Sequence, residues 1–188
     1  MFKINDKTYE IEYAFLDALL DDDKDKRLII GLVIAGKRID DNTLPSIDTE
    51  TLLKINSNEI KKWQDIGGRI IEWEKPSKVK FYNIGEKITS GFLYNAKIEF
   101  KNIDSKIFVR VKALCNSKFN DKKIETLSLE IDTEVNFRSI QIGPHKSEKD
   151  ARNRLNPYIN SNNFKYSVSK LELSNNSIVE MGQFDFKK

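Results

Sequence analysis

The stretch that decides the fold is residues 94–138, which read YNAKIEFKNIDSKIFVRVKALCNSKFNDKKIETLSLEIDTEVNFR. Apolar side chains occupy every second position in three consecutive runs, at 94–100, 107–115 and 127–137, with Thr133 as the one exception. Successive side chains of an extended strand point to opposite faces of a sheet, so a period of two is typical of strands. The three runs therefore predict an antiparallel meander over 94–138, with one buried face and one wet face.

The residues before the meander predict further strands and two short helices. Residues 2–4 and 9–13 have the composition of two strands joined by a turn. From residue 14 the apolar positions move to helical intervals, so we expect a short helix over 14–20. The nearly continuous apolar run 28–34 predicts a strand that is buried on both faces. A polar cap in front of residues 58–65 predicts a second brief helix.

After the meander, the sequence predicts one more helix and then further strands. Ser147 precedes an acidic turn that is close to a capping box, and the helix is expected to end near Asn156. Strands follow from Phe164. We therefore expect a β-rich α+β protein, mainly antiparallel sheet with two or three short helices. One domain should span 1–188, with 83–92 as the one stretch where a boundary could fall.

The composition is that of a folded globular protein. Of 188 residues, 39% are hydrophobic and 32% are charged, which suffices for a core without a disulfide or a metal. The single cysteine, Cys115, falls on the apolar face of the second meander strand, so we expect a buried thiol and a reducing compartment. The longest apolar run, 28–36, is far short of the ~20 residues that a membrane helix needs. Charged residues among the first seven positions argue against a secretory signal, so the sequence predicts a cytoplasmic protein. Abundant lysine, isoleucine and asparagine indicate an AT-rich genome and therefore a bacterial protein.

No motif in the chain has the spacing of a catalytic or metal site. His145 is the only histidine, so with a single cysteine the chain cannot form a Cys/His zinc cluster. The alternating aspartates at 21–25 resemble the start of a calcium loop, but Lys26 and Leu32 stand where that loop needs glycine and glutamate. Phosphate-binding loops and nucleophile elbows are also missing from the sequence. We therefore predict a non-enzymatic protein without cofactor or metal, with His145 in a surface or capping role.

The charge is distributed unevenly along the chain. Residues 1–50 carry 7 basic and 12 acidic side chains, whereas 51–188 carry 25 basic and 17 acidic ones. An acidic surface attracts a basic partner. The leading hypothesis is therefore a protein that binds another protein, in its sharper form an immunity-type antagonist that occludes a basic bacterial toxin domain. The predicted contacts are acidic residues of the N-terminal segment and of the third meander strand, namely Asp21, Asp22, Asp23, Asp25, Glu130, Asp132 and Glu134.

Other interpretations remain open. The acidic stripe at 130–134 could be a solvated sheet face that pairs with Arg110 and Lys112 of the neighbouring strand. The chain could instead bind single-stranded nucleic acid through the basic helix and an aromatic ring beside it. The residues of that alternative are Lys149, Arg152, Arg154 and Tyr158. The many carboxylates also allow a carboxylate-based hydrolase, which would need a pocket that holds at least two of them. The chain could also be a subunit of a larger assembly, in which case it would self-associate.

Overall fold

The computed structural model describes residues 1–21, 26–37, 44–77, 79–84, 89–119, 123–172 and 178–187. In chain order its elements are β1 (Phe2–Ile4), β2 (Lys7–Tyr9), β3 (Ile11–Asp21), β4 (Arg27–Gly36), β5 (Leu44–Asn56), the 3-10 turn η1 (Trp63–Ile66), β6 (Ile70–Trp73), β7 (Lys80–Ile84), β8 (Thr89–Ile103), β9 (Lys106–Phe119), β10 (Lys123–Ile142), α1 (Glu148–Leu155), the 3-10 turn η2 (Ser161–Asn163), β11 (Phe164–Glu172) and β12 (Ile178–Phe186). Among the described helices, none is long and apolar enough to cross a membrane.

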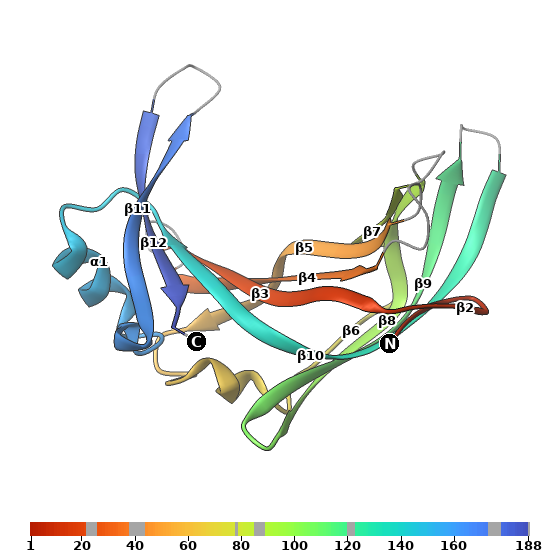
Figure 1. Cartoon of the computed structure of the whole chain (residues 1–188), viewed down its shortest axis with the longest axis horizontal. Helices are drawn as coiled ribbons and strands as arrows, with labels where there is room; N and C mark the ends of the chain where they lie inside the picture. The colour runs from red at the N-terminus through yellow and green to blue at the C-terminus, as the bar shows by residue number, and fades with distance from the viewer. Residues whose placement is uncertain are drawn as a thin grey trace.

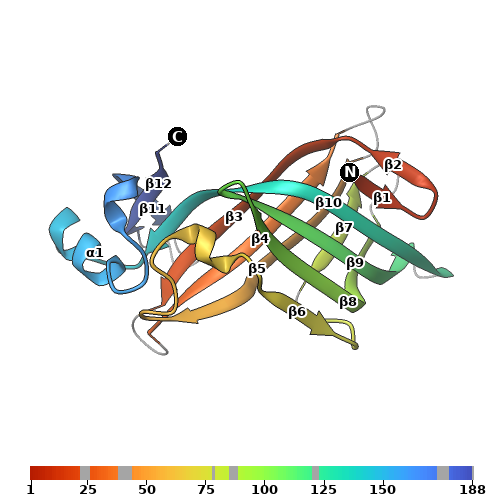
Figure 2. The ribbon, with the colours of Figure 1, turned by 90° about the horizontal axis from the view of Figure 1, so that it is seen from below.

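The twelve strands of the described residues belong to one mostly antiparallel sheet, which confirms the predicted fold class. Its longest strand, β10, pairs with β9 along its first part and with β3, in parallel, along its last part. The pairings β3–β4–β5–β7–β8–β9–β10 therefore return to their starting point and enclose the core. In Figure 1, β3, β4 and β5 form a floor between two raised ends, the β11–β12 hairpin on the left and the outer parts of β8, β9 and β10 on the right. Figure 2, from below, shows β8, β9 and β10 crossing beneath that floor.

The meander predicted for 94–138 is present as β8, β9 and β10. Ile98 pairs with Val111, and Val111 in turn with Ile131, and all three side chains are buried. The tight β8–β9 turn has positive φ at both central residues, Asp104 (51°) and Ser105 (65°). That backbone matches the right-handed twist of the two strands it connects. The alternating pattern thus places one face of each strand in the core and the other in solvent.

An aromatic cluster joins the C-terminal hairpin to the rest of the core. Its members are Trp63 of η1, Phe137 of β10, Phe164 of β11 and Phe186 of β12, with neighbouring ring centroids 5.5 to 6.1 Å apart. Tilted and edge-on ring pairs of this kind add to the hydrophobic stabilisation of the rings themselves. The cluster therefore anchors η1 and the hairpin to the sheet.

The helix predicted for 14–20 is wrong, because these residues lie in the strand β3. Leu16, Ala18 and Leu20 are buried and alternate with the more exposed Phe15 and Leu19. Apolar residues on both faces of this strand produce spacings that imitate a helix. Pairing with β4 on one side and β10 on the other decides in favour of the strand.

The helix predicted for 58–65 is also wrong, since only the turn η1 forms there. Asn58 has φ of 70°, a left-handed conformation that does not continue into a right-handed helix. Ile60 and Trp63 are nevertheless buried together, as the apolar positions suggested. The segment reaches the core without helical turns before Trp63.

The run 28–34 is a strand, as predicted, but it is fully covered on one face only. Leu28, Ile30, Leu32 and Ile34 are buried, and the intervening Ile29 and Val33 remain partly exposed. The outer face of β4 is open because it lines the groove described below.

The helix expected after Ser147 is confirmed as α1. The Ser147 hydroxyl oxygen accepts a hydrogen bond of 3.2 Å from the backbone N–H of Asp150, which satisfies one of the free donors at the helix start. Asn156 is the C-cap, at the residue where the sequence predicted the end. Ala151 and Leu155 hold the helix against the core.

Cys115 is fully buried, as expected, and burial raises the pKa of its thiol to about 11. At pH 8 only about one thiol in a thousand would then be the reactive thiolate. We expect a disulfide reagent to label Cys115 at least a hundredfold more slowly in the native protein than in denaturant. Stopped-flow absorbance of the released thiol measures both rates, and fast native labelling would contradict the burial.

Candidate binding groove

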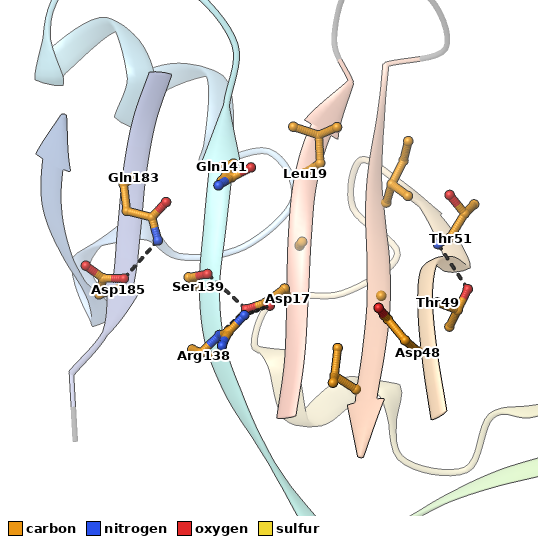
Figure 3. Close-up of a pocket in the computed structure, with 14 residues that line it drawn as sticks. Asp17, Leu19, Asp48, Thr49, Thr51, Arg138, Ser139, Gln141, Gln183 and Asp185 are labelled. Carbon is orange, nitrogen blue, oxygen red and sulfur yellow. Dashed lines mark hydrogen bonds and ion pairs between the residues drawn. The ribbon is translucent and has the colours of Figure 1, made fainter. Parts of the chain in front are cut away.

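The outer face of the sheet is hollowed into a groove of about 530 Å³ between the floor strands and the C-terminal hairpin. Side chains from β3, β4, β5, β10 and β12 line it, so segments from the whole length of the chain meet there (Figure 3). The lining residues are Asp17, Ala18, Leu19, Ile29, Gly31, Val33, Asp48, Thr49, Thr51, Arg138, Ser139, Gln141, Gln183 and Asp185.

A bulge in β10 creates the polar centre of the groove. The register against β3 shifts between Phe137 and Ser139, so Arg138 and Ser139 both lie on the outer face. β-Bulges commonly re-aim a side chain in this way. The bulge thus supplies two neighbouring hydrogen-bond donors to one carboxylate on β3.

That carboxylate, Asp17, is held by both donors. Arg138 forms a two-point ion pair with it, with Nε 3.0 Å from Oδ1 and the second guanidinium nitrogen bonded to Oδ2. The Ser139 hydroxyl donates to Oδ1 at 2.9 Å. The guanidinium carbon lies 3.5 Å from the centre of the Phe15 ring, which supports it from one side. Asp17 is therefore fixed in one orientation before any ligand arrives.

Two further carboxylates flank this centre. Asp185 lies on β12, next to Ser139 in the register, and accepts a hydrogen bond of 3.0 Å from Gln183. Asp48 lies on β5, on the other side of Asp17 in Figure 3. Among the lining residues that the structure describes, three are acidic and one, Arg138, is basic. The groove therefore carries excess negative charge.

The floor of the groove is partly apolar. Leu19 is 40% exposed, and Ile29 and Val33 are partly exposed beside it. Gly31, which pairs with Asp17 in the register, contributes no side chain. The arrangement offers one carboxylate at the centre, one on either side and hydrocarbon beside them, which suits a long basic side chain with an apolar stem.

Of the four acidic N-terminal residues of the sequence hypothesis, the structure describes Asp21 alone, and Asp21 does not line the groove. Asp21 ends β3 on the same face as Asp17 and Leu19 and lies opposite Arg27. The other three predicted contacts, Asp22, Asp23 and Asp25, lie outside the described residues. The structure thus places Asp21 at the end of the groove-lining strand.

The acidic stripe on β10 is neutralised by β9. Glu130 pairs with Lys112 at 3.5 Å, Asp132 with Arg110 at 2.7 Å, and Glu134 with Lys106 at 2.9 Å. The cross-strand cations Arg110 and Lys112, which the solvated-face interpretation expected, are therefore present. Exposed pairs of this kind contribute little stability, but they remove the excess charge that would attract a basic partner.

The basic residues of α1 mostly hold the helix in place. Arg152 donates to Glu148 at 2.8 Å and to the backbone oxygen of Ser161 at 2.7 Å. Its guanidinium also lies 5.3 Å from the ring centre of Phe184. Arg154 donates to the backbone oxygen of Pro144 at 2.7 Å, whereas Lys149 is exposed.

Tyr158 is a core residue rather than an exposed stacking ring. It is 5% exposed, and its hydroxyl donates to the backbone oxygen of Lys26 at 2.6 Å. Base stacking needs an open ring face. The structure therefore does not assemble the four residues of the nucleic-acid hypothesis into one open surface.

His145 lies in the loop before α1, as predicted, but it is half-buried. Its Nε2 is hydrogen-bonded to the Tyr166 hydroxyl, and its Nδ1 is buried with no partner among the described residues. Within the same part of the chain, no group of three or more His, Cys, Asp or Glu is placed to hold a metal ion. His145 thus packs the loop against the hairpin.

Sequence reasoning missed the groove residues because they are single polar residues on separate strands. One signal was available: Asp17 interrupts the apolar stretch Phe15–Leu20, where a lone carboxylate in a buried strand needs a partner. That signal does not identify Arg138, which is 121 positions away in the sequence.

Comparison with protein-family models, with curated proteins and with solved structures found no match to this chain.

Proposed function

We propose that this chain is a non-enzymatic binding protein that takes a basic segment of another protein into the groove. The observation that carries the proposal is the groove itself, with Asp17, Asp48 and Asp185 against the single guanidinium of Arg138. Charge complementarity of this kind raises the association rate and selects against acidic partners. It also disfavours nucleic acid, whose phosphates would meet the same carboxylates.

The fixed geometry of Asp17 supports the proposal. Since Arg138 and Ser139 already orient this carboxylate, a ligand need not order it on binding. Asp48 and Asp185 line the groove on either side of Asp17 and add two further negative charges. A partner arginine or lysine can lay its hydrocarbon stem over Leu19 and place its charge at these carboxylates.

The finer form of the proposal is an immunity-type antagonist that occludes a basic domain of a bacterial toxin. The excess of acidic residues in the first fifty positions would steer such a partner to the groove face. A tagged pull-down from lysate, with and without nuclease, tests this form. One stoichiometric basic protein that survives nuclease is the expected result, whereas nuclease-sensitive, heterogeneous material would contradict it.

Charge reversal in the groove should weaken capture of that protein. For the double variant Asp48→Lys, Asp185→Lys we expect a dissociation constant at least tenfold larger, which corresponds to about 1.4 kcal/mol of binding free energy. The affinity of this variant should also depend less on salt. Isothermal titration at two ionic strengths measures both effects, with thermal melting as the check on folding.

A matched control changes the same charge outside the groove. Asp6 and Glu74 are both exposed and do not line it, so Asp6→Lys with Glu74→Lys alters the net charge equally. This control should bind within about twofold of the wild type. Equal losses in the two double variants would show that net charge rather than the groove determines binding, and would contradict the proposal.

A further inference from the structure

We infer that the docking face extends past the groove to a second hollow, and that the partner segment carries an aromatic side chain about six residues from its basic residue. The inference rests on the proposed function and specifies the chemistry of its partner. Three observations carry it: the second hollow, its continuity with the groove, and the distance between the two.

The second hollow, of about 500 Å³, lies on the outer face of β7 and β8. Its lining includes Tyr82, Phe92 and Asn116, together with Lys80. Phe92 is 45% exposed, and the Lys80 ammonium nitrogen lies 5.9 Å from the centre of its ring. Aromatic side chains, phenylalanine among them, are enriched in protein–protein interfaces relative to the rest of a protein surface.

The strand register makes the two hollows one continuous face. Across neighbouring strands the row runs Phe15, Val33, Asp48, Lys80 and Phe92. The adjacent row along the same strands is buried in the core, so all five side chains of this row point outward. Val33 and Asp48 line the groove, and Lys80 and Phe92 line the second hollow.

The charges along this face change sign from one end to the other. Asp17 and Asp185 lie at the hairpin end, and Lys80 lies at the other end, next to Asp48 in the register. A segment that fits the face therefore has its cation over β3 and its aromatic ring, with or without a neighbouring carboxylate, over β8. A segment that covered the groove alone would leave Lys80 and Phe92 without contact to the partner.

The spacing of strands converts this arrangement into a sequence distance. Neighbouring strands lie about 4.8 Å apart, and four steps separate β3 from β8 by way of β4, β5 and β7, which gives about 19 Å along the curved outer surface of the sheet. An extended chain advances about 3.3 Å per residue. A segment that crosses the strands therefore carries its aromatic residue about six positions from its basic one.

Two synthetic peptides of identical composition test the inference. Both carry one arginine and one tryptophan on a glycine–serine background, six positions apart in one peptide and adjacent in the other. Millimolar titrations into nitrogen-15-labelled protein, followed by amide chemical shifts, report affinity and location together. We expect the spaced peptide to shift amides near both Asp17 and Phe92 and to bind about tenfold more tightly, because its second contact is intramolecular.

A matched pair of variants keeps the result specific. Phe92→Ala should reduce the spaced peptide to the affinity of the adjacent one, whereas Ile103→Ala, an equally exposed apolar residue on the same strand (49%), should leave it unchanged. Equal affinities for the two peptides, or shifts confined to the groove, would overturn this inference alone. Shifts at neither hollow would contradict the proposed function as well.

Discussion

Replacing Phe137 by alanine is expected to lower the free energy of unfolding by about 3–5 kcal/mol. The ring is 2% exposed, and it contacts the rings of both Trp63 and Phe164, at centroid distances of 6.1 and 5.9 Å. Its removal leaves a cavity where β10, η1 and β11 meet, so the loss includes contacts between three elements. Urea denaturation followed by circular dichroism measures the change.

The control for this substitution is Phe92→Ala, which removes the same side chain from an exposed position. We expect it to cost well under half as much, since a half-exposed ring loses less buried area and leaves no internal cavity. Similar losses for the two variants would contradict the anchoring role of the aromatic cluster. Amide hydrogen exchange in β11 and β12 should be faster in Phe137→Ala than in Phe92→Ala.

Replacing Gly91 by alanine should have the second largest effect, a destabilisation of about 1–3 kcal/mol or more. An added Cβ would lie 2.4 Å from the backbone oxygen of Asn116 and 2.7 Å from the sulfur of Cys115. The backbone oxygen cannot move away without separating β8 from β9. We therefore expect a lower melting temperature and faster labelling of the Cys115 thiol, because strand separation exposes it.

Gly143→Ala provides the matched control. A Cβ there meets no atom within 4 Å, so the melting temperature should stay the same or rise slightly as the unfolded chain loses freedom. Equal stability of the Gly91→Ala and Gly143→Ala variants would contradict the close approach of β8 and β9 at Gly91.

The features that could be predicted from the sequence are those that depend on residues close together in the chain. Alternation in the meander and the Ser147 cap of α1 depend on residues within one strand or one helical turn, so the sequence predicted both correctly. The buried thiol of Cys115 followed from the same alternation. In each case the neighbours that decide the structure are also neighbours in the chain.

The strands of the meander, the start and end of α1 and the β-rich class could all be predicted from the sequence, because backbone periodicity and capping are local properties. That residues 14–20 form a strand depends on tertiary contacts, since apolar residues on both faces fit a helix or a strand until β4 and β10 pair with them. The groove likewise depends on tertiary contacts, since Asp17 meets Arg138 across 121 positions and Asp48 and Asp185 join from two further strands. Contacts of that range depend on how strands pair and where a bulge falls, and neither leaves a periodic signal in the chain.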